Sequence, residues 1–166
     1  MAKTATFDIT SEVDLQEVDN ALNQARKEIS QRYDFKGATV EIEFNRKDGA
    51  LDLLADDDYK LKAVVEVIQG KLAKRGVPIR NLDYGEVDQA FGGKARQRIT
   101  LVQGISVEKG KEIVKAIKAA GFKKVNAQIQ DEQVRVSSPS IDELQAVIAM
   151  LRKEDFEIEL SFGNFR

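Results

Sequence analysis

The alternation of apolar and polar residues repeats along the chain, and this internal repeat constrains the fold more than any other feature. The first half begins with a strand-like alternation at 4–9 and a helix-like spacing of apolar residues over 11–30. It continues with strands at 38–44 and 50–54, a helix between the acidic run 56–58 and Gly76, and an edge strand at 77–84. This half is therefore expected to contain a strand, a helix, two strands, a helix and a strand.

The second half of the chain follows the same order. Its segments are a strand at 96–103, a helix at 106–121, strands at 124–130 and 133–137, a helix at 141–153 and a strand at 156–162. The repeated order predicts an α+β fold of two tandem ferredoxin-like (βαββαβ, RNP-like) modules. Each module is expected to hold a four-stranded antiparallel sheet with two helices on one face.

The repeat also predicts where the modules begin and end. Residues 1–84 are expected to form the first module and residues 95–166 the second. The segment 85–94 between them is rich in glycine and charge, as linkers often are. Because tandem copies of one fold can exchange strands, the pattern leaves open whether the N-terminal strand lies in its own sheet or in the other one.

Two residue types that carry much of enzyme chemistry are absent, since the chain has no cysteine and no histidine. Their absence excludes disulfides, thiolate or histidine metal sites, and the Ser-His-Asp and Cys-His arrangements. We therefore expect no catalytic residue, no metal site and no cofactor, in a protein that is not an enzyme. No apolar run reaches the roughly 20 residues of a membrane span, and the N-terminus lacks the apolar core of a signal peptide. A cytoplasmic location without membrane contact is expected.

Charge is unevenly distributed along the sequence. Residues 1–90 hold 13 Lys and Arg against 18 Asp and Glu, a net charge of −5, whereas residues 91–166 hold 13 against 10, a net charge of +3. Within 94–124 there are nine basic residues and two acidic ones, a net charge of +7. Such a basic block predicts an anionic partner, and a solvated helix face is the alternative interpretation.

Strand periodicity assigns side chains to the two faces of each predicted sheet. In the second module, Arg96, Arg98 and Arg135 are expected to point outward and to cluster near the middle of the sheet, beside Gln128 and other amides. The equivalent face of the first module is acidic, with Asp8, Glu41, Glu43 and Asp52. The three arginines and Gln128 are candidate ligand-binding residues. The alternative is that the two sheets dock on each other through arginine–carboxylate pairs.

The helix starts give further candidates, because a helix N-terminus attracts phosphate through its free N–H groups. In the first module, acidic residues already occupy these positions. In the second module, 103–106 and 137–140 precede helices without acids at the cap. These segments and the turn after the first one add four candidate ligand-binding residues: Gly104, Ser106, Lys109 and Ser138.

Aromatic residues give little support for base stacking on the sheets. The third strand of each module lacks the aromatics that stack bases in ribonucleoprotein domains. At the end of the first helix, Tyr33 and Phe35 could form a stacking clamp, but Phe35 matches Phe122 in the second half and is expected to fill the core. Tyr33 and Asp34 have no counterpart, and they are the residues of this stretch that could touch a ligand.

Several segments in combination carry a family resemblance. They are FDITSEVDLQEVDNALNQARKEISQRYDFKG (7–37), QGIS (103–106), VNAQIQDEQVRVSS (125–138), DELQAVIAMLR (142–152) and FGNFR (162–166). Together they resemble the YajQ family of bacterial proteins, and the resemblance extends over nearly the whole chain. The resemblance implies two tandem RNP-like modules and a cytosolic nucleotide-binding role. It also implies a nucleotide such as GTP, ATP or cyclic di-GMP as ligand, with tRNA or RNA and a transcription regulator as further partners.

The residues and the resemblance together lead to one hypothesis and two alternatives. The leading hypothesis is a non-enzymatic, regulatory nucleotide-binding protein. The first alternative is a nonspecific RNA- or tRNA-binding protein, motivated by the basic block. The second is a protein-interaction scaffold in which the two sheet faces bury each other.

Overall fold

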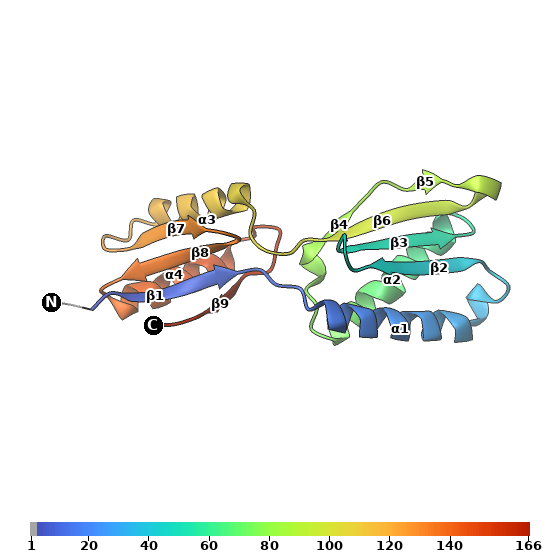
Figure 1. Cartoon of the computed structure of the whole chain (residues 1–166), viewed down its shortest axis with the longest axis horizontal. Coiled ribbons are helices and arrows are strands. Elements are labelled where there is room, and N and C mark those ends of the chain that lie inside the picture. The colour runs from blue at the N-terminus through green and yellow to red at the C-terminus, as the bar shows by residue number, and fades with distance from the viewer. Residues whose placement is uncertain (1–2) are drawn as a thin grey trace. The chain divides into compact units, whose positions relative to one another are not determined.

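The N-terminal strand β1 (Ala5–Thr10) pairs antiparallel with two strands from the other end of the chain. The computed structural model describes residues 3–166 (Figure 1) and places β1 between β8 (Gln133–Ser138) and β9 (Ser161–Gly163). With β7 (Asn126–Gln130), these strands form a four-stranded sheet in the order β7-β8-β1-β9. That is the strand order of a ferredoxin-like module, with β1 as its first strand.

The strand that begins the second repeat, β6 (Ala95–Leu101), lies in the other sheet. This sheet has the order β2-β3-β6-β4, and β5 pairs with part of β6. Its remaining strands are β2 (Val40–Asn45), β3 (Ala50–Ala55), β4 (Leu82–Tyr84) and β5 (Asp88–Gln89). Here β6 occupies the position of the module's first strand, although it is the last strand of unit 2 in the sequence.

The two sheets belong to two compact units that differ from the expected domains. Unit 1 combines the chain up to Glu12 with Gln103–Arg166, and unit 2 is the continuous segment Val13–Val102. The chain passes from one unit to the other after Glu12 and again after Val102, and not at the predicted boundaries 84 and 95. The segment 85–94 is no linker, because it contains β5 and folds back to pair with β6 inside unit 2.

Two helices pack on one face of each sheet, as the α+β prediction requires (Figure 1). The α-helices are α1 (Leu15–Gln31), α2 (Asp58–Lys74), α3 (Val107–Ala119) and α4 (Ile141–Lys153). The short 3₁₀ helices are η1 (Tyr33–Phe35), η2 (Ile79–Asn81) and η3 (Phe91–Gly93). Within residues 3–166, no helix has the length and apolar character that crossing a membrane requires.

Each α-helix begins at a side chain that accepts free N–H groups of its first turn, which is the usual role of an N-cap. The N-cap residues are Asp14 for α1, Asp57 for α2, Ser106 for α3 and Ser140 for α4. The neighbouring Asp56 accepts the N–H of Thr39. The acidic run 56–58 therefore has a structural role at the start of α2, as predicted.

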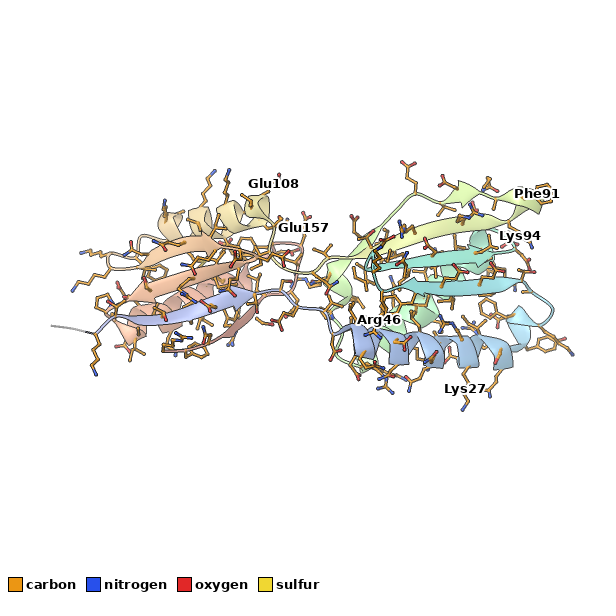
Figure 2. All side chains as sticks on the ribbon, viewed as in Figure 1. Lys27, Arg46, Phe91, Lys94, Glu108 and Glu157 are labelled. Atoms are coloured by element: carbon orange, nitrogen blue, oxygen red, sulfur yellow. The ribbon has the colours of Figure 1, made fainter. Side chains whose placement is uncertain are left out.

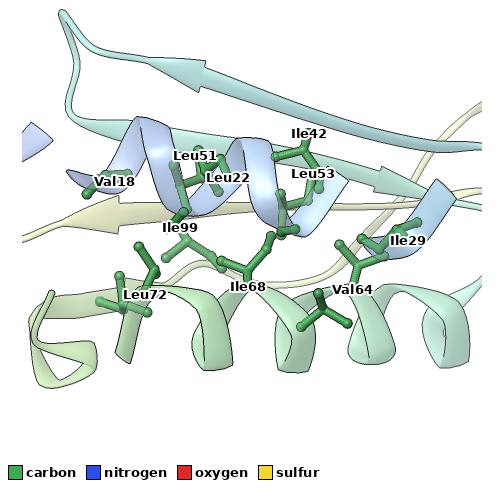
Figure 3. Packing of buried hydrophobic residues seen from close by; sticks show 14 of the residues in the cluster. Val18, Leu22, Ile29, Ile42, Leu51, Leu53, Val64, Ile68, Leu72 and Ile99 are labelled. Atoms are coloured by element: carbon green, nitrogen blue, oxygen red, sulfur yellow. The ribbon is translucent and has the colours of Figure 1, made fainter. Parts of the chain in front are cut away.

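The core of unit 2 lies between its two helices and the inner face of its sheet (Figure 3). Leu51 and Leu53 of β3 and Ile99 of β6 face the helices and are buried, as the alternating pattern predicts. The helices contribute apolar residues at helical spacing: Val18, Leu22 and Ile29 from α1, and Val64, Ile68 and Leu72 from α2. Burial of each large aliphatic side chain contributes about 1.5–3 kcal/mol to stability.

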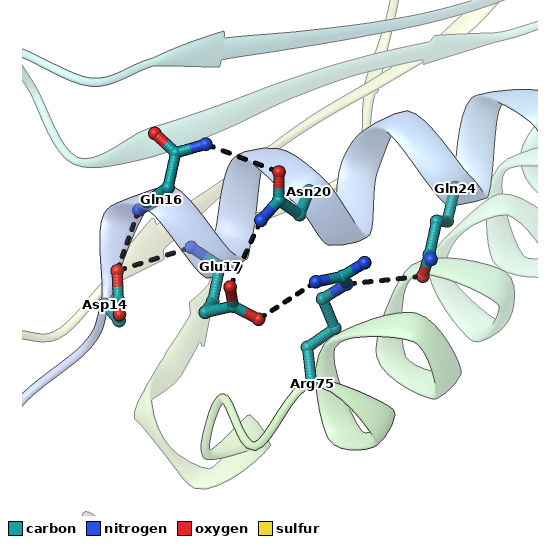
Figure 4. A network of polar contacts seen from close by, with 6 residues as sticks. All are labelled: Asp14, Gln16, Glu17, Asn20, Gln24 and Arg75. Carbon is teal, nitrogen blue, oxygen red and sulfur yellow. Dashed lines mark hydrogen bonds and ion pairs between the residues drawn. The ribbon is translucent and has the colours of Figure 1, made fainter.

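A polar network joins the start of α1 to the end of α2 (Figure 4). Arg75, just past α2, forms an ion pair with Glu17 at 3.2 Å and a longer contact with Gln24 at 3.5 Å. Asn20 donates to Glu17 and accepts from Gln16. The network fixes the mutual position of the two helices where the apolar stripe ends.

The core of unit 1 needs residues from both ends of the chain. Phe7 and Ile9 of β1 are fully buried beside Val134 and Val136 of β8. The Phe7 ring contacts those of Phe162 and Phe165 near the C-terminus, with ring centroids 6.1 and 6.0 Å apart. The helices add further buried residues: Ile113, Ile117, Val147 and Leu151.

The end of α1 also matches its prediction. Phe35 is buried below the guanidinium of Arg32 and the ammonium of Lys60, which lie 5.1 and 5.3 Å from its ring centroid. Tyr33, by contrast, is 88% exposed. The pKa of the Asp34 carboxyl is held below its ordinary value, chiefly by its hydrogen bonds with Arg32. The two-aromatic clamp is therefore excluded, because one of its rings is part of the core.

Substitution of Gly104 tests the turn that leads into α3. Gly104 has φ +77°, and a Cβ there would lie 2.9 Å from the Cβ of Glu132. Gly121 has φ +79° and open space around it, so it is a matched control. Left-handed backbone costs a non-glycine residue about 1–2 kcal/mol, and the contact with Glu132 adds to this only at Gly104. Urea denaturation should therefore show Gly104→Ala to be more destabilising than Gly121→Ala. Equal losses of unfolding free energy would contradict this packing.

Candidate functional site

The face of the unit 1 sheet that is turned away from its helices is polar and nearly neutral. Strand register brings its side chains into rows, with Gln128 opposite Arg135 and Arg135 opposite Asp8. The outward positions on the three strands β7, β8 and β1 are Asn126, Gln128, Gln130, Gln133, Arg135, Ser137, Thr6, Asp8 and Thr10. We call these nine residues the open face. Amides and hydroxyls predominate on it, and each can both donate and accept hydrogen bonds.

A three-residue polar network lies in the middle of the open face. Arg135 donates from Nε and Nη2 to the two carboxylate oxygens of Asp8, at 2.9 and 3.3 Å. The side-chain amide of Asn164 donates to Asp8 Oδ2 at 2.7 Å. Asp8 is only 5% exposed, so its charge depends on these donors for compensation.

Asn164 reaches Asp8 because a bulge directly follows β9. Gly163 lies opposite Asp8, and Arg166 exchanges both backbone hydrogen bonds with Thr6. Two residues therefore stand between these pairs on the C-terminal side and one on β1, which is the count of a β-bulge. Asn164 has φ +54°, a left-handed conformation that asparagine tolerates better than most residues. The bulge directs its amide onto the carboxylate.

The network orients Arg135 and favours the charged forms of both Arg135 and Asp8. The hydrogen bond from Arg135 holds the pKa of the Asp8 carboxyl below its ordinary value, and the Asn164 amide acts in the same direction. Burial acts in the opposite direction but does not reverse the shift. Asp8 raises the pKa of Arg135 in return. Asp8 takes up Nε and Nη2, while the Arg135 side chain stays 37% exposed, so the Nη1 donors can bind a ligand on the open face.

The other two candidate arginines lie in unit 2, so the expected cluster of three does not exist. Arg96 and Arg98 are exposed on β6, which pairs with β3 and not with β8. Arg98 binds Asp52 at 3.2 Å and Asp48 at 3.0 Å. The prediction placed them on the outward face correctly, but it placed them in the wrong sheet, because the strands are exchanged.

The exchange of strands also removes the charge asymmetry between the modules. Unit 1 holds 11 Lys and Arg against 12 Asp and Glu, and unit 2 holds 15 against 16, so each unit has a net charge of −1. Arg135 and Arg98 each bind a carboxylate of their own sheet. The arginine–carboxylate pairs that motivated the docking alternative thus occur inside the units.

The start of α3 is less open to an anion than its sequence suggests. The Ser106 hydroxyl accepts the N–H of Lys109, and the N–H of Gly104 donates to the Ser11 carbonyl. An acid that the local sequence does not reveal, Glu132 of the β7–β8 turn, lies against Gly104. The cap thus satisfies one N–H of the first turn, and a carboxylate lies beside the segment that precedes the helix.

The two remaining candidates are also engaged elsewhere. Lys109 lies within 3.3 Å of Glu112 and 3.7 Å of Glu157, and Figure 2 shows Glu157 close to the start of α3. Ser138 is buried, and its hydroxyl accepts the N–H of Ser140 before α4. Of the eight candidates, only Gln128 and Arg135 are neighbours on the open face.

Sequence reasoning missed Asp8 and Asn164, the residues that hold Arg135. Asp8 was assigned to the acidic face of the first module, because the N-terminal strand was counted with its neighbours in sequence. Asn164 lies in the C-terminal FGNFR segment, where the Gly-Asn pair is a signal for a bulge or turn. This signal does not predict which side chain accepts a hydrogen bond from the Asn164 amide.

Comparison with known proteins gives a family match along nearly the whole chain. The family model described as "Nucleotide-binding protein YajQ-like" matches residues 5–166. A protein of Trichlorobacter lovleyi and one of Syntrophotalea carbinolica, both named nucleotide-binding protein, are each 56% identical over 97% of this chain and 98% of their own length. A protein of Carboxydothermus hydrogenoformans with the same name is 51% identical over the full length of both chains.

Substitution of Asp8 by Asn tests the network through the pH dependence of stability. A carboxyl whose pKa is lowered by folding stabilises the native state above its unfolded pKa of about 3.9, and this contribution is lost as the pH falls through the folded pKa. At neutral pH, Asp8→Asn should reduce the free energy of unfolding by about 1–3 kcal/mol, because charged hydrogen bonds are lost. Urea denaturation between about pH 7 and pH 3 should show the difference from the unmodified protein shrinking toward acid.

The exposed Asp83 of unit 2 gives the control for this test. Asp83→Asn should change the free energy of unfolding by less than about 0.5 kcal/mol throughout. A deficit of Asp8→Asn that stays constant to the acid end would contradict a stabilising ion pair at Asp8.

Proposed function

This chain belongs to the YajQ-like family of nucleotide-binding proteins, and from that premise we propose that it binds a nucleotide on the open face of unit 1 without catalysing a reaction. The relatives' names support nucleotide binding in general. The position of the site is our inference from the chemistry of the open face.

One observation carries the proposal: within residues 3–166, Arg135 keeps its Nη1 donors free and lies among amides and hydroxyls on the sheet face turned away from the unit 1 helices. The Asp8 carboxylate and the Asn164 amide hold Arg135 in place, so little ordering is needed when a ligand binds. A guanidinium fits phosphate oxygens and also the acceptor edge of guanine. Gln128, directly across from Arg135, can donate to and accept from a base.

The composition of the open face indicates how a nucleotide would be held. None of its nine side chains is aromatic, so a base would have to be held by hydrogen bonds and by the plane of the Arg135 guanidinium. With one arginine and one carboxylate, the open face has no net charge to attract a polyanion. These features favour a small nucleotide, such as GTP, ATP or cyclic di-GMP, over a long nucleic acid.

A regulatory role is the simplest interpretation of a site that binds a nucleotide but does not transform it. The chain has no cysteine to act as a nucleophile and no histidine to act as a base beside Arg135. A bound nucleotide would instead change what the open face presents to other molecules. The physiological ligand would then act as a signal, and a transcription regulator is one class of partner that could respond to it.

Calorimetric titration with cyclic di-GMP, GTP and ATP tests the proposal. We expect saturable binding of at least one of them, and Gln128→Ala should weaken it by about tenfold through the loss of a hydrogen bond worth about 1–1.5 kcal/mol. Gln128 is exposed, so this variant leaves the fold intact. Arg135→Gln should weaken binding further. Arg96→Gln, an exposed arginine of unit 2, is the control and should leave the affinity within about twofold.

Two results would overturn this proposal. The first is the absence of heat with all three nucleotides at several hundred micromolar. The second is an equal loss of affinity in the Gln128 and Arg96 variants, which would put the site elsewhere. Binding only to RNA, with a steep fall in affinity as salt rises, would support the nonspecific RNA-binding alternative instead.

A further inference from the structure

Strand β2 is the outer strand of the unit 2 sheet, and one of its backbone groups shows how its free edge is protected. β2 pairs with β3 on one side only. On the other side, Arg26 of α1 donates to the Ile42 carbonyl from Nε at 3.2 Å and from Nη2 at 2.6 Å. The Ile42 carbonyl therefore points away from β3, toward the free edge.

The backbone N–H and C=O groups of the neighbouring residues alternate in direction along β2. In an antiparallel pair, every second residue of an edge strand turns its N–H and C=O outward. Val40, Ile42 and Phe44 therefore present their backbone groups along the edge. The flexible Arg26 side chain covers one carbonyl of this row. An added strand would form its backbone hydrogen bonds with the same row.

A groove with an apolar floor and polar borders runs beside this edge on the helix side of the sheet. Its volume is about 520 Å³. It is lined by Arg26, Ile29, Ser30, Phe35, Ala38, Val40, Glu41, Ile42 and Glu43. Phe35, Ile29 and Ile42 are buried and form an apolar floor, while Val40 is half-buried. Small or branched apolar side chains would fit this groove.

The same edge is acidic on the opposite face of the sheet, although Glu41 and Glu43 also border the groove. Glu41 and Glu43 alternate with Val40 and Ile42 and are both exposed. Within residues 3–166, neither glutamate forms an ion pair, whereas their neighbour across the strand, Asp52, is bound by Arg98. Two carboxylates without an ion-pair partner in residues 3–166 thus lie beside a row of outward backbone groups and the groove with its apolar floor.

We propose that the free edge of β2 binds an extended peptide in which apolar and basic residues alternate. Such a peptide would add to the sheet as a further strand through backbone hydrogen bonds. Since successive side chains of a strand point to opposite faces, its apolar residues would enter the groove and its Lys or Arg residues would meet Glu41 and Glu43. A peptide N–H would replace Arg26 on the Ile42 carbonyl. This surface is in unit 2 and does not depend on the nucleotide proposal.

Fluorescence anisotropy with two labelled peptides and the full-length protein tests this proposal. One peptide alternates lysine and valine, and the other has the same composition with all lysines before all valines. At about 150 mM salt, where exposed charges are screened beyond about 8 Å, the alternating peptide should bind at least about tenfold more tightly. The double variant Glu41→Lys, Glu43→Lys should weaken that binding by at least about tenfold.

Two further variants separate loss of the site from loss of folding. Glu41→Gln with Glu43→Gln removes both charges without adding new ones and should still weaken binding severalfold. Glu86→Lys changes an exposed glutamate away from β2 and should leave affinity within about twofold. Thermal unfolding should be similar in all variants, because the substituted side chains are exposed.

Hydrogen exchange identifies the binding mode. The amides of Val40, Ile42 and Phe44 should exchange more slowly with the alternating peptide bound, because they then donate to its carbonyls. Equal affinity for the two peptides, no effect of the glutamate variants, or protection confined to other strands would each overturn the proposal. Equal affinity would in addition indicate simple attraction of a cation.

Discussion

The antiparallel pairing of β1 with β8, together with that of β6 with β3, is the constraint on which the rest of the structure depends. Since β1 pairs in unit 1, the sheet of unit 2 is completed by β6, and unit 2 is a continuous segment that interrupts unit 1 in the sequence. Loop closure over this distance costs little more than over a shorter one, since its cost grows only with the logarithm of length. The pairing brings Asp8 within hydrogen-bond distance of Arg135, although the two are 127 positions apart in the sequence.

The sequence predicted the type and order of the four helices and of most strands because these had a clear local period. It missed β5, and the strands expected at 77–84 and 156–162 are shorter in the structure, as β4 and β9. It could not assign β1 and β6 to their sheets, and the reason lies in particular residues. β1 buries Phe7 and Ile9 and β6 buries Ile99 and Leu101, so each offers two large apolar residues on one face. Either strand would satisfy either set of helices. The choice depends on packing and pairing across the whole chain, which periodicity does not record.

The same uncertainty decided how much of the candidate site could be predicted. Side-chain direction was correct for Gln128, Arg135, Arg96 and Arg98, since it follows from the strand period alone. Which of these side chains are neighbours depends on the sheet that each strand joins, and the prediction placed Arg96 and Arg98 in the wrong sheet. The contacts at Gly104 and at Ser138 come from Glu132 and Ser140, whose approach depends on turn geometry. The bulge that directs Asn164 to Asp8 is likewise a tertiary feature.

The two sheets thus have different surfaces although they share one plan. In unit 1, a single arginine is held among amides on a neutral open face, which suits a small polar ligand. In unit 2, acidic residues border an edge strand and its groove, which suits an extended basic peptide. The unit 1 surface depends on the exchange that places β1 beside β8, whereas the unit 2 surface is built by residues 26–43.

The central claim is that the open face of unit 1 holds the nucleotide. A two-dimensional NMR titration of the isotope-labelled protein with cyclic di-GMP, GTP and ATP tests it most directly. We predict that a binding nucleotide shifts the side-chain amide signals of Gln128 and Asn164, the Arg135 Nε–H signal and the backbone signals of β1 and β8. Shifts confined to unit 2, with these signals unmoved at saturation, would contradict the claim.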